Sequence, residues 1–303
     1  METMRWIPPL LGLILSPLLV GIINRTKAKF AGRAGQPVLQ LYFDLWKLIR
    51  KGAVYSRTAG WVFRAGPMVG LGAAGTALLL VPMGGVESVI SFRGDLILFA
   101  YLFGMMRFFT VLAALDTGSP FEGMGASREV TFSALAEPAL LLGLGAISRQ
   151  SHELSLSGML ATVTPEAWGQ FSPVLAMVAV SLLVVFLAEN ARIPVDDPNT
   201  HLELTMIHEV MVLDHSGPDF AYILYGASLK LWILGMILIG IVVPVRSGSV
   251  MMDVVCATVG IFILAVVVGV IESCMARLRM MRVPQLLLGA IAFSLLALVL
   301  VSR

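Results

Sequence analysis

Cysteine is scarce in this chain of 303 residues, which contains only Cys256 and Cys274. Both fall in one apolar run, where 18 helical positions correspond to about 27 Å of axial rise. This separation excludes a disulfide between them within a continuous helix. No Cys-x-x-Cys pair is present, so the chain cannot ligate an iron–sulfur cluster or a nickel–iron centre by itself. Any redox chemistry therefore belongs to partner proteins.

Charged residues are also rare, at 13% of the chain against 58% hydrophobic residues. This composition excludes an ordinary soluble domain. Several apolar runs reach the roughly 20 residues that a bilayer span requires. The expected transmembrane helices are residues 6–23, 67–86, 95–115, 130–148, 171–190, 219–243, 254–274 and 284–301. We find no internal repeat, and we predict a single all-α integral membrane domain over residues 1–303 with about eight transmembrane helices.

The first apolar run has a second interpretation, because Arg5 before it is also typical of a signal peptide. The run is long and lacks a cleavage site of small residues, so we expect a retained helix. Helix-start signals occur at Thr164-Pro165, an N-cap with proline in the first turn, and at Ser119-Pro120-Phe121-Glu122, which has capping-box spacing. Gly123 and Gly125 predict that any helix starting at Ser119 is short.

The connector over residues 24–64 is strongly basic. Within it, apolar residues recur at helical spacing over residues 38–49, which predicts an amphipathic helix at the membrane interface. A role in docking partner proteins and a plain membrane-hugging linker both fit this pattern. The connectors after the first, third, fifth and seventh spans share one side of the membrane and contain fourteen lysine and arginine residues, against five on the other side. By the positive-inside rule, both termini lie outside and the loop over residues 190–218 lies in the cytoplasm.

Five ionisable residues fall inside the expected spans or at their ends: Arg107, Glu137, Glu189, Lys230 and Glu272. Ionisable groups at such depth usually face the interior of a helix bundle and mark ion or proton routes. Glu189 and Arg107 lie near enough to span ends for snorkelling or structural pairing to explain them equally well. Glu137 and Lys230 lie deeper, which favours a function, and Glu272 is ambiguous.

The polar stretch from Ala188 to Glu209 gathers acids, prolines and histidines in a chain that is otherwise apolar. Thr200-His-Leu-Glu203 fits a capping box and predicts a helix to about Leu213. His201, His208 and His215 recur every seven residues, a step of about 10.5 Å that is too long for two imidazoles to share one metal on a straight helix. We therefore expect these histidines to hydrogen-bond or titrate within a polar pocket.

Three segments carry a family resemblance. They are Gly21-Ile-Ile-Asn-Arg through Trp46-Lys-Leu, Leu115-Asp-Thr-Gly-Ser-Pro-Phe with Gly125-Ala-Ser-Arg-Glu, and Ala188-Glu-x-x-Arg-x-Pro-x-Asp followed by Thr200-His-Leu-Glu-Leu-Thr-Met-Ile-His-Glu. Together they resemble the complex I subunit 1 family, in the variant found in group 4 membrane-bound [NiFe] hydrogenases of the formate hydrogenlyase type. The resemblance covers nearly the whole chain.

This resemblance implies a non-catalytic membrane subunit of an oxidoreductase complex in the cytoplasmic (inner) membrane, with no cofactor of its own. The implied partners are a [NiFe] large subunit with its metal centre, a small iron–sulfur subunit and antiporter-like membrane subunits. Residues expected at the docking junction are Arg192, Asp196, Asp197, Arg128 and Glu129. Residues expected in proton transfer or coupling are Glu137, Glu189, Glu203, Lys230, Glu272, His201 and His208.

Two alternatives remain at this point. Quinone-reactive members of the resembled family carry a Glu-x-Glu-x-Glu run, whereas this chain has Asn199, His201 and Glu203 at those positions. This difference favours the hydrogenase branch over a quinone-site subunit of a complex I-like enzyme. A stand-alone secondary transporter is the alternative from another class, although such transporters are often built from two related halves, which we do not find here.

Overall fold

The computed structural model describes residues 2–197 and 206–302. Its α-helices are α1 Ile7–Phe30, α2 Gln40–Ile49, α3 Trp61–Leu80, α4 Asp95–Asp116, α5 Pro120–Ser151, α6 Leu156–Thr162, α7 Pro165–Glu189, α8 Gly217–Val242, α9 Val250–Cys274 and α10 Val283–Val301. Short 3-10 helices are η1 Glu2–Trp6, η2 Glu209–Val212 and η3 Met280–Arg282. Within the described ranges there is no β-strand, only an isolated bridge between Met83 and Val86.

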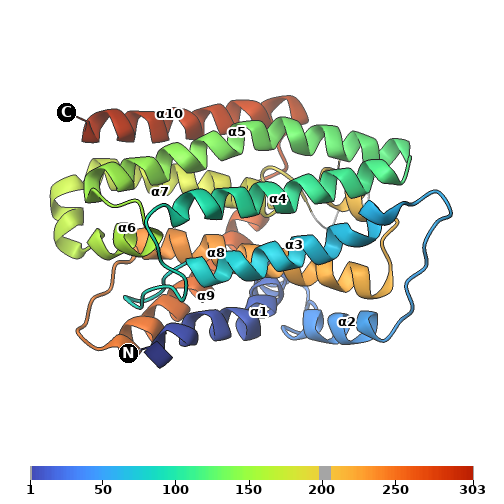
Figure 1. Ribbon diagram of the computed structural model, residues 1–303, viewed down its shortest axis with the longest axis horizontal. Helices are drawn as coiled ribbons and strands as arrows, with labels where there is room; N and C mark the ends of the chain where they lie inside the picture. Colours follow the sequence, from blue (N-terminus) through green and yellow to red (C-terminus); the bar gives the residue numbers. More distant parts are fainter. Residues whose placement is uncertain (1, 198–205, 303) are drawn as a thin grey trace.

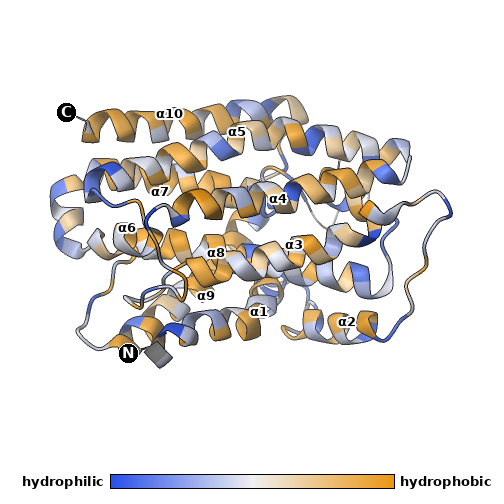
Figure 2. Ribbon diagram, in the orientation of Figure 1, coloured by the Kyte–Doolittle hydropathy of each residue, from blue (hydrophilic) through white to orange (hydrophobic). Residues whose placement is uncertain are grey.

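Eight of these helices are long and apolar enough to cross a membrane, which confirms the predicted all-α fold and number of spans. They run roughly parallel or antiparallel along the longest axis of the molecule, and the two termini lie at the same end (Figure 1). Hydrophobic residues follow the long helices, whereas hydrophilic residues gather in the connectors and near helix ends (Figure 2). The predicted boundaries of the second span are wrong, because α3 begins at Trp61 and ends at Leu80.

Helix α8 lies at the centre of the bundle. It packs against α1, α2, α3, α7 and α9, and it is apolar on nearly all sides, as expected of a helix with neighbours all round. Trp232 in its middle is fully buried. Trp168 of α7 donates a hydrogen bond from Nε1 to the carbonyl oxygen of Ile241 at 2.8 Å. Any ionisable residue on α8 is consequently surrounded by protein.

The helix start predicted at Ser119 is only partly right. Helix α5 does begin there, but it continues for 32 residues to Ser151, so the predicted short helix is wrong. A methyl group at Gly125 would lie 2.3 Å from Val210 Cγ1, so this glycine permits close packing rather than ending the helix. The capping box is absent, because Ser119 accepts no side-chain cap hydrogen bond. At Thr164 the predicted N-cap is confirmed, since Oγ1 accepts from the backbone N–H of Ala167 at 3.2 Å.

A helix over residues 38–49 is present as α2, with Phe43, Trp46 and Ile49 exposed. Its placement at the membrane interface stays a prediction. The helix expected from Thr200 to Leu213 is wrong over its described part, residues 206–213, which forms only the short η2. The backbone N–H groups of Ile207 and His208 instead donate to Asp196 Oδ2, at 3.1 and 3.2 Å. The capping box at Thr200 lies outside the described residues.

Candidate functional site

A buried arginine joins three carboxylates from neighbouring helices. Arg107 lies on α4, and its side chain is only 11% exposed. Its Nε lies 3.2 Å from Glu129 Oε1 on α5, and its Nη2 lies 2.5 Å from Glu189 Oε1 at the end of α7. Its Nη1 also pairs with Glu137 of α5. Charges removed from water are tolerated only when they are paired in this manner, so the three helices are held together by one guanidinium.

Glu189 carries the network on to α8. Its Oε2 lies 2.7 Å from Lys230 Nζ, and both side chains are mostly buried. One carboxylate therefore faces two cations, the guanidinium on α4 and the ammonium on α8.

At its other end the network enters the loop that follows α7. Glu129 Oε2 lies 3.1 Å from His208 Nε2, and His208 Nδ1 lies 3.5 Å from Asp196 Oδ2. Asp196 Oδ1 lies 2.9 Å from Arg277 Nη2. We refer to Lys230, Glu189, Arg107, Glu137, Glu129, His208, Asp196 and Arg277 as the central network. It is continuous from the inner part of α8 to the loop.

The two loop members of this network have shifted pKa values. Burial by itself lowers the pKa of His208, but the carboxylates of Glu129 and Asp196 outweigh it and raise this pKa above its ordinary value. Burial by itself raises the pKa of Asp196, but the hydrogen bond and charge of His208, together with Arg277, lower it. The imidazolium is therefore held at a pH where a solvent-exposed histidine is already neutral.

A second cluster fastens the same loop to the ends of α1 and α9. Glu272 has a side chain that is 0% exposed, and it lies 2.8 Å from Lys27 Nζ and 3.5 Å from Arg192 Nη1. Lys27 also lies 3.9 Å from Asp197. Burial lowers the pKa of Arg192, and the Glu272 carboxylate opposes this shift. We call Lys27, Arg192, Asp197 and Glu272 the α1–α9 cluster.

Glu137 differs from the rest of the central network in its exposure. It lies near the middle of α5, yet its side chain is 45% exposed while it pairs with Arg107. A carboxylate at that depth is unfavourable against lipid. The network therefore reaches the outer surface of this chain at Glu137.

The predicted residues fall into three groups. Those that the structure brings together are Glu137, Glu189, Lys230, His208, Glu129 and Asp196 in the central network, and Glu272, Arg192 and Asp197 in the α1–α9 cluster. Arg128 donates to the carbonyl oxygen of Met206 at 2.8 Å, which also fixes the loop. His201 and Glu203 lie outside the described residues. The roles assigned to all of them stay predictions.

Several partners were missed by sequence reasoning. Lys27 and Arg277 were counted only as connector charges, although each neutralises a buried carboxylate. The surroundings of His215, one of the three histidines expected in a polar pocket, were missed as well: its ring stacks on Phe63 with centroids 3.9 Å apart, and burial lowers its pKa to about 4. Nearby in sequence, the backbone N–H of Asp214 donates to the buried Glu122 at 3.1 Å. These partners are distant in sequence, and no local pattern marks them.

In the part of the chain that the structure describes, no group of three or more histidine, cysteine or acidic residues is arranged to hold a metal ion. The charged groups are instead spaced as successive ion pairs. Such a chain of carboxylates, imidazole and amine within a helix bundle can transfer protons or transmit a change in charge.

Comparisons with known proteins agree with this architecture. A profile of the NADH dehydrogenase family matches residues 6–302. Formate hydrogenlyase subunit 4 of Escherichia coli (strain K12) is 33% identical, with 94% of each chain covered. Hydrogenase-4 component C of the same organism is 29% identical over 89% of this chain and 86% of that protein.

The fold is shared with a solved structure. A chain of the membrane-bound sulfane sulfur reductase, an archaeal respiratory membrane complex, superimposes with a TM-score of 0.83 at 18% identity, over 99% of this chain and 98% of that one. Together with the eight apolar helices, these similarities describe a multi-pass membrane protein whose relatives are subunits of larger assemblies. The chain belongs to the NADH dehydrogenase family, the family of complex I subunit 1.

Proposed function

We propose that this chain is the membrane-anchor and proton-pathway subunit of a membrane-bound [NiFe] hydrogenase complex of the formate hydrogenlyase or energy-converting type. The names of its two E. coli relatives support the hydrogenase assignment. The observation that carries the pathway is the central network, which links the loop after α7 to Lys230 within the bundle. No catalytic group is assigned to this chain.

The central network contains titratable groups in the loop and a continuous connection from them into the bundle, and coupling requires both. His208 and Asp196 lie in the loop, where a change of charge in a bound redox partner alters their protonation. Glu129, Arg107 and Glu189 then connect this loop to Lys230 through contacts of 3.2 Å or less. In the low dielectric of the bundle interior, a change in one charge shifts the proton affinity of its neighbours strongly.

Glu137 provides the lateral exit. Because it lies on the outer surface at mid-span, it fits a contact with a further membrane subunit better than a contact with lipid. Antiporter-like membrane subunits are the partners that this proposal requires, together with a [NiFe] large subunit and a small iron–sulfur subunit. The metal centres belong to those soluble partners.

Docking of the soluble arm takes place at the loop of residues 190–218, which we place in the cytoplasm with both termini outside. Arg192, Asp196 and Glu129 are buried within this chain. Their contribution to docking is therefore to fix the shape of the loop rather than to form the contact surface. Arg128 and Asp197 also belong to this junction, and Glu203 and His201 are the residues that receive the redox signal there.

A quinone-site subunit of a complex I-like enzyme is the second candidate, favoured by the family profile. Affinity purification of the tagged chain from native membranes, followed by mass spectrometry, separates the two. We expect a [NiFe] large subunit and an iron–sulfur subunit to co-purify without bound quinone. Co-purification of NADH-oxidising subunits, or a stoichiometric quinone, contradicts the hydrogenase assignment.

A further inference from the structure

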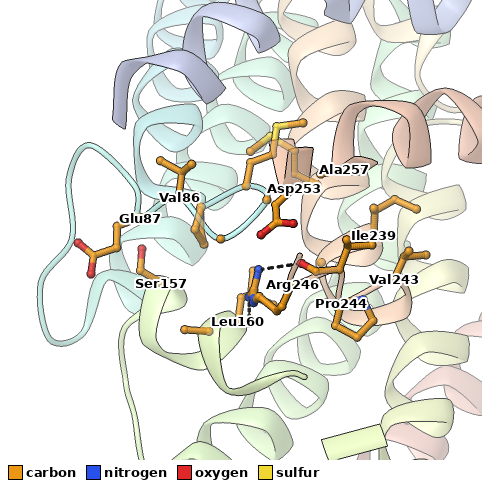
Figure 3. A pocket seen from close by; sticks show the side chains of 18 of the residues that line it. Val86, Glu87, Ser157, Leu160, Ile239, Val243, Pro244, Arg246, Asp253 and Ala257 are labelled. Carbon is orange, nitrogen blue, oxygen red and sulfur yellow. Dashed lines mark hydrogen bonds between the residues drawn. The ribbon is translucent and has the colours of Figure 1, made fainter. Parts of the chain in front are cut away.

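At the end of the bundle where the termini lie, three connectors enclose a cavity of about 60 Å³. Two of them follow α3 and α8, and the third element is the short helix α6 between α5 and α7. Figure 3 shows Arg246 and Asp253 directed into the space between these elements. An adjoining hollow of about 250 Å³ shares Gly84, Gly85, Ala161, Arg246 and Asp253 with the cavity. The two spaces therefore form one site, separate from both ion-pair clusters.

The charges around this site are opposite in sign but not paired with each other. Arg246 donates to two carbonyl oxygens, that of Leu160 at 3.0 Å and that of Val245 at 3.5 Å. Among the described residues no carboxylate lies within ion-pairing distance of it, 4.0 Å. Since a guanidinium has five N–H donors, donors remain for a ligand.

Asp253 is buried, and in the part of the chain that the structure describes only its Oδ1 accepts hydrogen bonds. Its Oδ1 accepts from the N–H and the hydroxyl of Ser247, at 2.8 and 2.7 Å. A Cβ atom added at Gly85 would lie 3.1 Å from Arg246 Nη1 and 3.7 Å from Asp253 Oδ2. A ligand next to Gly85 would therefore contact the Arg246 guanidinium on one side and the Asp253 carboxylate on the other.

Apart from Ser157 and Glu87, which pairs with Arg5, the rest of the wall is apolar. Ile239 from the end of α8, Val243 just beyond it, and Ala257 and Ile261 of α9 line the cavity. Arg246 itself lies in the connector between Val242 and Val250, where two membrane-spanning helices end. The site therefore lies where the headgroups of membrane lipids are found.

We propose that this site binds a phosphoethanolamine group, supplied by the headgroup of a membrane phospholipid. Arg246 binds the phosphate, because guanidinium groups match phosphate oxygens in geometry and charge. Asp253 Oδ2 accepts from the ammonium group, and the apolar wall contacts the glycerol and upper acyl chains. A simple anion would face the Asp253 carboxylate without a partner for it, whereas a headgroup carrying both charges satisfies the two sides.

The test measures retained lipid on the full-length chain, purified in mild detergent and returned to nanodiscs of phosphatidylethanolamine and phosphatidylglycerol. Native mass spectrometry counts the bound lipids for wild type, Arg246→Gln, Asp253→Asn and Ala161→Phe, which fills the hollow and keeps both charges. Arg93→Gln is the matched control, since Arg93 is an exposed arginine on the connector that carries Gly85. Asparagine at 253 can still accept from Ser247, which preserves the local fold.

We expect the three site variants to bind phosphatidylethanolamine roughly tenfold more weakly, while Arg93→Gln behaves as wild type. Unchanged retention in Arg246→Gln and Ala161→Phe overturns the proposal. If wild type binds phosphatidylglycerol as well as phosphatidylethanolamine, and Asp253→Asn does not change either, the assignment of a zwitterionic headgroup is overturned. Soluble phosphoethanolamine that displaces the lipid at equal concentration supports the headgroup chemistry but overturns the membrane as its source.

Discussion

Lys230 and Glu189 form an ion pair between α8 and α7, with 2.7 Å between Nζ and Oε2. Their side chains are only 13% and 6% exposed, so the pair lies inside the protein rather than at its surface. The other oxygen of Glu189 contacts Arg107 of α4 at 2.5 Å. The Glu189 carboxylate at the end of α7 thus binds one cation from the interior of α4 and one from the interior of α8. It links these three helices to one another.

Replacement of Arg107 by methionine should destabilise the protein strongly. The substitution leaves Glu129, Glu137 and Glu189 without their shared cation, and breaking a buried ion pair from one side costs about 3–5 kcal/mol. We expect a lower midpoint of thermal inactivation in detergent and poor recovery from membranes. Arg149→Gln is the control, because Arg149 is an exposed arginine in the last turn of α5. Equal thermal midpoints for Arg107→Met and Arg149→Gln would contradict this account.

Replacement of Glu272 by glutamine should release the loop after α7 from α1 and α9. Glu272→Gln removes the carboxylate that pairs with the buried Arg192, whereas the Lys27 side chain is 21% exposed and can reach water. In Lys27→Met, the buried Glu272 keeps Arg192 as its partner at 3.5 Å. We therefore expect Glu272→Gln to be more destabilising than Lys27→Met, by about 2 kcal/mol or more, the order of the penalty for leaving a buried charge unpaired.

The double variant Lys27→Met with Glu272→Gln tests the contact itself. A coupling energy above about 0.5 kcal/mol in the double-mutant cycle indicates a direct interaction. Limited proteolysis of the loop over residues 190–218 provides the structural readout, and unchanged cleavage in Glu272→Gln would exclude the tethering role.

Stability should fall in mildly acidic solution because of His215. Burial lowers its pKa to about 4 from an ordinary value of 6.5. Because the pKa of His215 is lower in the folded protein, the unfolded chain binds the proton more tightly. The free energy of unfolding is therefore undiminished by His215 above pH 6.5, and it decreases as the pH falls toward 4. The loss is on the order of 3 kcal/mol over that interval.

His215→Phe retains the ring that stacks on Phe63 and removes the titration. We expect its thermal midpoint to depend less on pH between 6.5 and 4.5 than that of wild type. Parallel pH profiles for the two proteins would show that another group causes the acid sensitivity.

Membrane orientation can be measured directly. Arg33 follows α1 and Asp214 precedes α8, so with eight spans both positions belong to the same side. Reporter fusions after Arg33 and after Asp214 should both report the cytoplasm, as the bias of basic residues predicts. A periplasmic signal at either position would reverse the docking surface as well.

The sequence predicted much of the fold because membrane helices leave a strong local signal. Runs of apolar residues identified all eight spans, and Thr164-Pro165 identified the start of α7. A position inside a span identified Glu137 and Lys230 as candidates, and a position at a span end identified Glu189. Boundaries were less accurate: the connector around Met83 is apolar enough to be taken for helix, although it forms a turn.

Partners in the network could not be predicted for a different reason. Arg107 meets Glu189 across 82 positions of sequence, and nothing local distinguishes that pairing from snorkelling to the membrane surface. The helix expected before Leu213 failed because Asp196 binds the N–H groups of Ile207 and His208, which a helix would have used. Tertiary contacts of this kind override local capping signals.

The central claim is that protons move through Glu189, and the decisive measurement is proton uptake by proteoliposomes that contain the whole complex. Glu189→Gln leaves Lys230 and Arg107 without this carboxylate and should lower the yield of complex. In the fraction that assembles with wild-type subunit stoichiometry, hydrogen evolution from an artificial electron donor should continue at the wild-type rate per complex, whereas most of the coupled proton movement should be lost. Glu153→Gln, at an exposed glutamate outside both clusters, should retain both activities. Wild-type proton movement in an assembled Glu189→Gln complex would contradict the proposed pathway.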